Sequence, residues 1–273
     1  LFSRRVNATR PRLGLRGVHN LADHLAETRH TLMAVSPNLV EADPLWSHPH
    51  SITGYIFSED TGALPPDVEA FLDAGEPPVY IGFGSVSVSD PLAFTRLVGE
   101  ASLRSGVRVL LSRGWTGLGH GEPRSGQRKK DPALPPSVHL VGPTPHATLF
   151  PRLSGVVHHG GSGTVHNAVR AGVPQFILPQ IADQYFWGHR IHQLGMGPRP
   201  IPVSRITVRK MTQRLRELHS QPHFKHNSLR FARKLTREDG VSNAASQLLA
   251  ALPSCLSAPP TVFPTMDCRF GEW

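Results

Sequence analysis

The chain has 273 residues, of which 39% are hydrophobic and 7% aromatic, and this suffices for one substantial domain or two small ones. No run approaches the roughly 18 consecutive apolar residues of a membrane-spanning helix. The only cysteines, Cys255 and Cys268, exclude a fold built on disulfide bonds or zinc and indicate a reducing, cytoplasmic compartment. The net charge of +9 is interpreted as a solvated basic surface, because the arginines lack interleaved aromatic residues, and no nucleic-acid partner is expected.

The first part of the sequence predicts the end of one domain and a linker. The chain starts at Leu1 without a start methionine or a signal peptide, so we expect a fragment. A short apolar strand is predicted at Thr31–Val35, and a Pro-rich run continues to about Pro66. The expected division is a domain remnant with linker at residues 1–50, a second domain at 51–252 and a disordered tail at 253–273.

From Val79 onward, short apolar strands alternate with helices. Gly106 is well placed to end the first helix, since glycine readily adopts the left-handed conformation of a helix cap. This alternation predicts βαβ units and a parallel sheet with helices on both faces, which is a Rossmann-like α/β fold. The strands are expected at Val79–Gly82, Val107–Ser112, Val138–Val141, Val156–His159 and Gln175–Leu178, and the later helices at Gly163–Ala171, Tyr185–Leu194, Val208–His219, Phe224–Thr236 and Ser242–Leu252.

Ligands of an open parallel sheet bind beyond the carboxyl ends of the strands, so the residues after each strand are candidates. After the first strand, Gly84 and Ser85 offer a close backbone approach and a hydroxyl donor, which suit an anion. Glycine and serine are also ordinary turn residues. This pair alone therefore fits a simple turn equally well.

The strongest candidate is the segment His158-His159-Gly160-Gly161-Ser162-Gly163-Thr164, which leads from a buried strand directly into a helix. Unpaired N–H groups and the helix dipole at such a start favour a diphosphate. Neighbouring strand residues point to opposite faces, so we predict that His159 contacts the phosphate and that His158 packs in the interior. A turn without a ligand is the weaker alternative, and the G-x-G-x-x-G spacing of a dinucleotide site is absent.

Two further candidates follow later strands. Asp183 and Gln184 lie at a helix start, where a carboxylate beside an amide suits the hydroxyl groups of a sugar. A helix N-cap at Asp183 explains the same position equally well. Pro145 and His146 follow the strand that ends at Val141 and are suited to border a nucleobase and its ribose, although by themselves they fit a turn.

Two ordered segments carry a resemblance to a known family. One runs from Pro145 through the glycine-rich turn to Thr164, and the other from Arg170 through Asp183-Gln184 to Gly188. Together they resemble the donor-binding, C-terminal domain of the UDP-dependent glycosyltransferases of the GT-B fold. The paired histidines before the glycines and the Trp187-Gly188 pair are most similar to the sterol 3-beta-glucosyltransferases. The likeness extends from about Thr31 to about Leu252.

The resemblance implies an inverting transfer of a hexose, expected to be glucose, from UDP-glucose to a hydroxyl group of a sterol or similar lipid. It implies that Ser85 and the amides of Gly160 to Thr164 hold the diphosphate beside His159. The hexose would contact Asp183 and Gln184, and the uridine would lie against Trp115, Pro145 and His146. No cofactor or metal is implied, and peripheral contact with a membrane is compatible with a lipid acceptor. Asn167 stands where plant relatives place a ribose-binding Glu, which is a departure from the family pattern.

The resemblance also implies that the catalytic base and most of the acceptor pocket belong to an N-terminal domain. Only the last strand of that domain, near Leu32–Val35, is recognisable in the sequence. Two alternatives remain open. The acceptor could be a natural product rather than a sterol, or the chain could be a truncated, inactive module that binds UDP-sugars.

Overall fold

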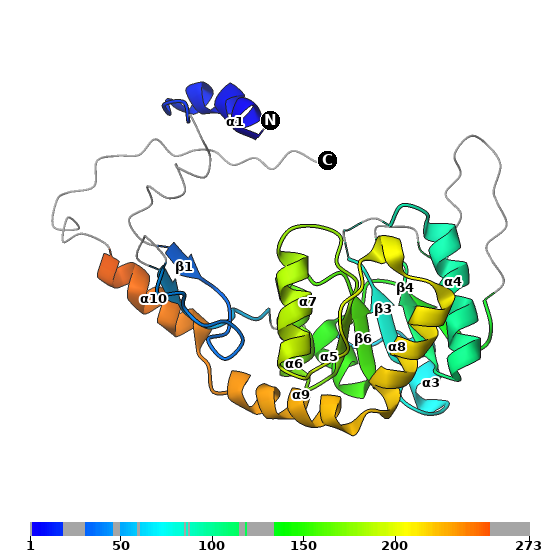
Figure 1. Ribbon diagram of the computed structural model, residues 1–273. Coiled ribbons are helices and arrows are strands. Elements are labelled where there is room, and N and C mark those ends of the chain that lie inside the picture. The colour runs from blue at the N-terminus through cyan, green and yellow to red at the C-terminus, as the bar shows by residue number, and fades with distance from the viewer. Residues whose placement is uncertain are drawn as a thin grey trace. The chain divides into compact units, whose positions relative to one another are not determined.

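The computed structural model describes residues 2–18, 31–45, 50–58, 61–84, 86, 88–114, 118 and 134–251 (Figure 1). The chain forms two compact units. Unit 1 comprises Leu1–Ala34, Ala42–Gly54 and Asp239–Trp273, and unit 2 comprises Val35–Glu41 and Tyr55–Glu238. The division expected at residues 50 and 252 stays a prediction; in the structure the segment Val35–Glu41 belongs to unit 2 and the last helix belongs to unit 1.

Unit 1 contains a two-stranded parallel sheet, β1 and β2, in which Thr31 pairs with His50. The backbone N–H of Thr53 donates to Met33 O (3.1 Å), and Thr53 O accepts from Asn243 Nδ2 (3.0 Å), which ties the last helix to the end of β2. The elements are α1 (Phe2–Thr9), η1 (Arg10–Leu13), β1 (Thr31–Met33), β2 (His50–Ile52) and α10 (Gly240–Ala251).

Unit 2 is built on a five-stranded sheet in the order β5-β4-β3-β6-β7. All four strand pairs are parallel. The expected α/β class with a parallel sheet is therefore confirmed. The strands are β3 (Val79–Gly82), β4 (Val109–Ser112), β5 (Val138–Val141), β6 (Gly155–His158) and β7 (Gln175–Ile177).

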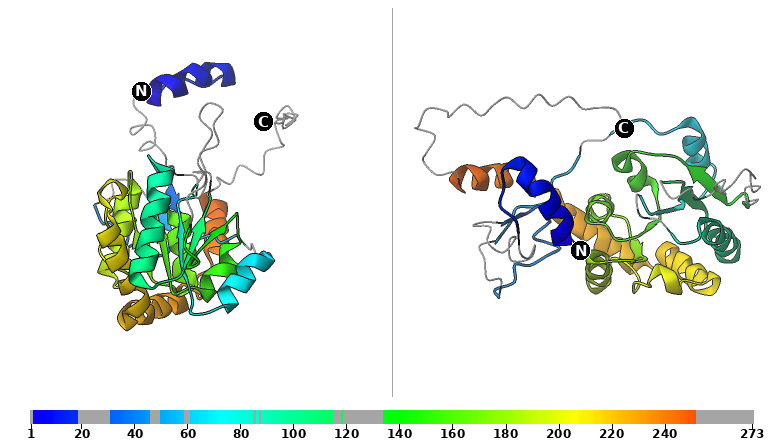
Figure 2. Two further views of the ribbon diagram at one scale, coloured as in Figure 1. Left: turned by 90° about the vertical axis from the view of Figure 1, so that its right-hand side faces the viewer. Right: turned by 90° about the horizontal axis from the view of Figure 1, so that it is seen from above.

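Helices cover both faces of this sheet (Figure 2), because side chains alternate between the two faces along each strand. Val79 and Ile81 of β3 belong to the apolar cluster beneath α4 and α8, whereas Tyr80 belongs to the cluster on the opposite face, with α3, α5 and α6. A third cluster joins α6, α7 and α9. The helices are α3 (Pro66–Asp73), α4 (Pro91–Ser105), α5 (His146–Leu149), η2 (Phe150–Arg152), α6 (Ser162–Arg170), α7 (Asp183–Gln193), η3 (Val203–Arg205), α8 (Val208–Ser220) and α9 (Pro222–Leu235).

The ends of these elements agree with the sequence where a local signal defines them. Asp90 caps α4 by accepting a hydrogen bond from Ala93 N (2.9 Å), and Gly106 ends it with φ of 74°. The strand expected from Val107 begins instead at Val109, because Val109 pairs with Val79, the first residue of the neighbouring β3. Likewise, the strand expected to end at His159 ends at His158, which pairs with the last residue of β3.

No helix in the described part of the chain is long and apolar enough to span a membrane. The expected tail at 253–273 lies outside the described residues.

Candidate functional site

The topological switch point of the sheet, where the strand order reverses, lies between β3 and β6. The chain passes from β3 outward to β4 and β5 on one side, and then returns to place β6 and β7 on the other. Connections leave the carboxyl ends of β3 and β6 in opposite directions, and the ligands of doubly wound sheets bind at such a switch point. The loop beginning Phe83-Gly84 and the turn beginning His159-Gly160 lie at this point.

The glycine-rich turn connects β6 to α6, and no side chain caps the start of α6. Gly160 has φ of 97°, and Gly161 occupies the N-cap position with φ of −64°. The first α-helical bond of this turn runs from Val165 N to Gly161 O (3.0 Å). The N–H groups of Ser162, Gly163 and Thr164 therefore precede the helical ladder, and such groups at a helix start attract an anion.

His158 is a buried scaffold residue, as predicted. Its Nδ1 accepts a hydrogen bond from Gly160 N (3.1 Å), so its Nε2 carries the proton and donates to Gln175 Oε1 (2.9 Å). Gln175 Nε2 in turn donates to Val165 O (3.4 Å) in α6. Burial lowers the pKa of His158 to about 3, with a further decrease from neighbouring His159. The ring is thus neutral and fixes the backbone of the turn.

His159 lies on the opposite side, half buried and facing the loop after β3. Its Cε1 atom lies 3.8 Å from the position that a Cβ atom would occupy on Gly84, so the two predicted residues come together. Its Nδ1 is buried and has no hydrogen-bond partner among the described residues. Burial lowers the pKa of His159, and the negative charge of Asp183 partly opposes this shift. A neutral imidazole with unused hydrogen-bonding capacity therefore lies beside the turn.

The start of α7 packs directly against the glycine-rich turn. A Cβ atom on Gly160 would lie 3.1 Å from Gln184 O and 2.8 Å from Ile177 Cγ2. Gln184 is buried, and its Oε1 accepts hydrogen bonds from Gln180 N (2.8 Å) and Ile181 N (3.2 Å). Gln184 therefore shapes the loop after β7.

Asp183 is the exposed first residue of α7. The N-cap position belongs to Ala182, and no side-chain hydrogen bond caps the helix, so the alternative reading of Asp183 as an N-cap is wrong. Ala182 has φ of 44°, a strained conformation for a residue with a Cβ atom, and such strain concentrates at functional sites. The unusual backbone of Ala182 directly precedes Asp183, whose negative charge acts on His159.

The residues expected near the uridine are only partly described. Pro145 occupies the N-cap position of α5, and the His146 ring stacks on Phe150 with centroids 4.3 Å apart and meets the edge of Tyr80 at 5.9 Å. His146 is thus held against the sheet by two aromatic rings. Ser85 and Trp115 lie outside the described residues. Asn167 donates from Nδ2 to Gly163 O (2.9 Å) within α6.

Three residues near the turn were not expected from the sequence. His166 is fully buried; its Nδ1 donates to Ser162 O (2.7 Å) and its Nε2 accepts from Ser36 N (3.1 Å). Tyr55 stacks on His166 at 4.1 Å, and its hydroxyl lies 3.2 Å from where a Cβ atom of Gly163 would lie. For Gln175 the sequence does contain a signal, since a polar residue within an apolar strand indicates a buried hydrogen bond. The contacts of His166 with Ser36 and with Tyr55 join segments that are far apart in the sequence, and no local pattern indicates them.

Titratable side chains do not form a metal centre within the described residues, where no group of three or more His, Cys, Asp or Glu is found.

Comparison with known proteins agrees with this architecture. Residues 124–250 match a family model described as "Erythromycin biosynthesis protein CIII-like, C-terminal domain". A sterol 3-beta-glucosyltransferase of Arabidopsis thaliana, UGT80B1, is 36% identical over 226 residues, which cover 82% of this chain and 35% of that protein. The sterol 3-beta-glucosyltransferase of Aspergillus terreus is 39% identical over 199 residues, which cover 71% of this chain and 14% of that protein.

Solved glycosyltransferases share the fold. The glycotransferase of kitacinnamycin superposes with a TM-score of 0.64 at 20% identity, over 91% of this chain and 61% of that one. VinC, crystallised in complex with DTDP, superposes with a TM-score of 0.59 at 21% identity, over 81% of this chain and 51% of that one. The chain thus has the fold of these glycosyltransferases and is similar in sequence to sterol 3-beta-glucosyltransferases. It spans about a third of the length of the Arabidopsis glycosyltransferase and a smaller part of the fungal one.

Proposed function

We propose that this GT-B chain supplies the donor-binding half of an enzyme that transfers glucose from UDP-glucose to the hydroxyl group of a sterol or similar lipid, with inversion. The observation that supports it most is the junction of three elements at the switch point: the uncapped start of α6, His159 facing Gly84, and Gln184 against Gly160.

The diphosphate of the donor would lie at the start of α6, against the amides of Gly160 to Thr164 and beside His159. These dipoles are fixed before the donor arrives, so they would stabilise the charge that develops on the leaving UDP without reorganisation. Ser85, which follows Gly84 in the sequence, would add a hydroxyl donor. Asp183 and Gln184 would take the hexose, and Trp115, Pro145 and His146 the uridine.

In the proposed reaction, the acceptor oxygen attacks the anomeric carbon while the bond to the diphosphate oxygen breaks. A general base removes the acceptor proton, and UDP leaves with the bonding electron pair. The residues assigned above would bind the donor and stabilise the leaving group. None of these residues is proposed as the general base. UDP-glucose is a substrate of this reaction and not a cofactor.

The acceptor class is proposed from the relatives. Identities of 36% and 39% link the chain to sterol 3-beta-glucosyltransferases, whereas the solved glycosyltransferases are only 20% and 21% identical. The sterol acceptor is therefore preferred. A natural-product acceptor is the second candidate, which the matching family model favours by its description.

The test is isothermal titration of the chain with UDP and dTDP. UDP should bind more tightly than dTDP, and His159→Ala should weaken UDP binding about 5- to 150-fold, which corresponds to the roughly 1–3 kcal/mol of a hydrogen bond to a charged group. His226→Ala on the exposed surface of α9 is the matched control and should bind like the wild type. An absence of UDP binding, or full binding by His159→Ala, would contradict the proposal.

A further inference from the structure

One segment near the C-terminal end of unit 2 is strongly basic. Overall there are 29 Lys and Arg residues and 20 Asp and Glu residues. Ten of the basic residues, but only one acidic residue, Glu217, lie between Arg205 and Arg237, and the two signs are equal in number elsewhere. This segment includes α8 and α9, which follow one another in the chain. Eight of these ten basic residues lie on the two consecutive helices α8 and α9.

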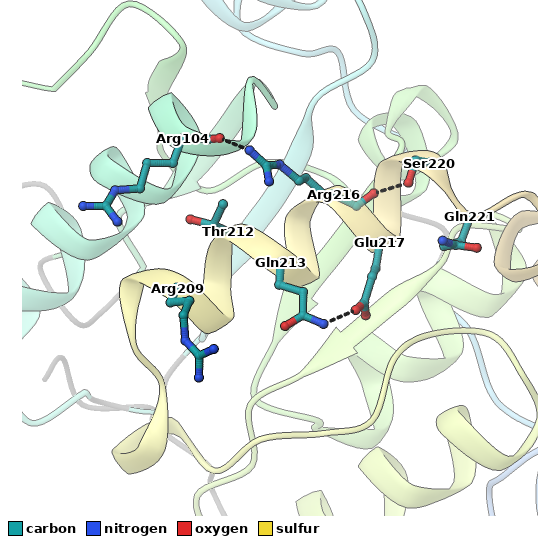
Figure 3. A pocket seen from close by; sticks show the side chains of 8 residues that line it. All are labelled: Arg104, Arg209, Thr212, Gln213, Arg216, Glu217, Ser220 and Gln221. Atoms are coloured by element: carbon teal, nitrogen blue, oxygen red, sulfur yellow. Dashed lines mark hydrogen bonds between the residues drawn. The ribbon is translucent and has the colours of Figure 1, made fainter.

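The outer face of α8 is flanked by two grooves. One has a volume of about 690 Å³ and lies between α4 and α8, with Arg209, Arg216 and Glu217 along it (Figure 3). Arg104 also lines this groove, but its side chain points away from α8 and pairs with Glu100. The other, of about 370 Å³, lies toward α7 and contains Arg205, Lys210 and Arg214. Basic side chains therefore lie on both sides of α8.

Few of these charges are neutralised within the described residues. Of the α8 cations, Arg214 alone has a carboxylate partner, which is Glu217 on the same helix. Arg216 donates to the backbone carbonyl of Arg104, and Lys210 donates to Arg205 O (2.9 Å), so both keep their full charge. The exposed residues Arg230 and Arg233 extend the charged surface along α9. Uncompensated cations at this density attract an anionic surface.

Exposed apolar side chains lie next to the second groove. Ile181, two residues before α7, is 62% exposed, and Tyr185 and Phe186 in the first turn of α7 are 40% and 49% exposed. Tyr185 itself lines the groove with Lys210 and Arg214. Aromatic and aliphatic side chains beside basic ones suit the interface of an anionic membrane, where the rings reach the acyl boundary and the cations contact headgroup phosphates. A nucleic acid would favour aromatic rings interleaved with the cations, and α8 has none.

We propose that the outer face of α8, with its two grooves and the exposed start of α7, docks on an anionic lipid membrane. Headgroup phosphates would contact Arg209 and Arg216 on one side of α8 and Lys210 on the other. The docking does not require a bound donor. It can therefore be tested separately from the proposed transfer.

The test is sedimentation of the chain with two kinds of vesicle, pure phosphatidylcholine and phosphatidylcholine with about one third phosphatidylserine. Binding should require phosphatidylserine and should be lost when salt rises from about 0.1 M to about 1 M, because the Debye length shortens from about 10 Å to about 3 Å. The double variant Arg209→Gln/Arg216→Gln should bind about 30-fold more weakly, since each basic residue near such a surface contributes about a fivefold factor.

The matched control is Arg4→Gln/Arg5→Gln on exposed positions of α1, which removes the same charge and should leave vesicle binding unchanged. Thermal unfolding and UDP titration of both variants verify that the fold and the donor site are intact. Equal binding to both kinds of vesicle, loss of binding in the α1 variant instead, or binding to duplex DNA in preference to vesicles would each overturn the proposal.

Discussion

Mild acid should destabilise unit 2 because two neutral histidines are buried in its interior. His158 and His166 are both fully buried, and burial lowers their pKa values to about 3 and about 4 from the ordinary value of 6.5. Between these values and 6.5, the unfolded chain binds a proton at each histidine and the folded chain does not. Stability is therefore complete above pH 6.5 and is lost as the pH falls toward the folded-state values.

The magnitude follows from the titration of the unfolded chain. Between pH 7 and pH 5, each histidine costs about 2 kcal/mol of unfolding free energy, or about 4 kcal/mol for the pair. A domain of this size is stabilised by only about 5–15 kcal/mol. The loss would therefore be a large fraction of the total, and few carboxylates titrate within this range of pH.

The assay is urea unfolding at pH 7 and pH 5 of the wild type and of His166→Gln. The glutamine amide can donate to Ser162 O and accept from Ser36 N, but it does not titrate. The difference between the two pH values should be about 2 kcal/mol smaller in His166→Gln than in the wild type. His189→Gln, which removes an exposed ring on α7, is the control and should behave like the wild type. An unchanged acid loss in His166→Gln would show that His166 is not held neutral in the folded chain.

Three further predictions concern the candidate site. Asp183→Ala should weaken UDP-glucose binding and leave UDP binding nearly unchanged in titration calorimetry; equal losses would place Asp183 outside the sugar site. Gly160→Ala should cost roughly 2–4 kcal/mol in urea unfolding, from the positive φ and the contact with Ile177, whereas Gly142→Ala, with open space around it, should stay within about 0.5 kcal/mol. The 273-residue chain alone should bind UDP-glucose without glucosylating a labelled sterol, because its described residues form one donor-type sheet; a steryl glucoside product would contradict this.

The sheet was predictable because its signals are local. Val79–Gly82 and Val138–Val141 are bounded as expected, since each apolar run is short and ends at a turn residue. The strand ends that were missed depend on neighbouring strands, as at Val109. The start of α7 at Asp183, two residues earlier than expected, follows from the unusual backbone of Ala182. No hydrophobic pattern indicates a strained dihedral angle.

The sequence predicts the glycine-rich turn as a motif, but it does not predict the long-range hydrogen bonds that hold the neighbouring segments in place. The hydrogen bond from Ser36 to His166 joins residues 130 positions apart. Ser36 Oγ and Asn38 Nδ2 both donate to Glu238 Oε1, at 2.5 Å and 2.7 Å, across about 200 positions. These contacts exist only because the segment at Val35–Glu41 packs within unit 2. A single sequence contains no periodicity that reports such a pairing.

The two adjacent histidines have opposite roles because of where the strand ends. His158 is the last residue in the sheet, so its side chain enters the interior, where Gln175 Oε1 fixes its tautomer and leaves Nδ1 free to accept from Gly160 N. That hydrogen bond draws the backbone back toward the strand, which requires the positive φ of Gly160, and Ile177 leaves no room there for a Cβ atom. The reversal places His159 outside the ladder, over Gly161 and facing Gly84. Exchanging the two histidine roles would need a strand one residue longer, and the register with Gly82 at the end of β3 prevents this.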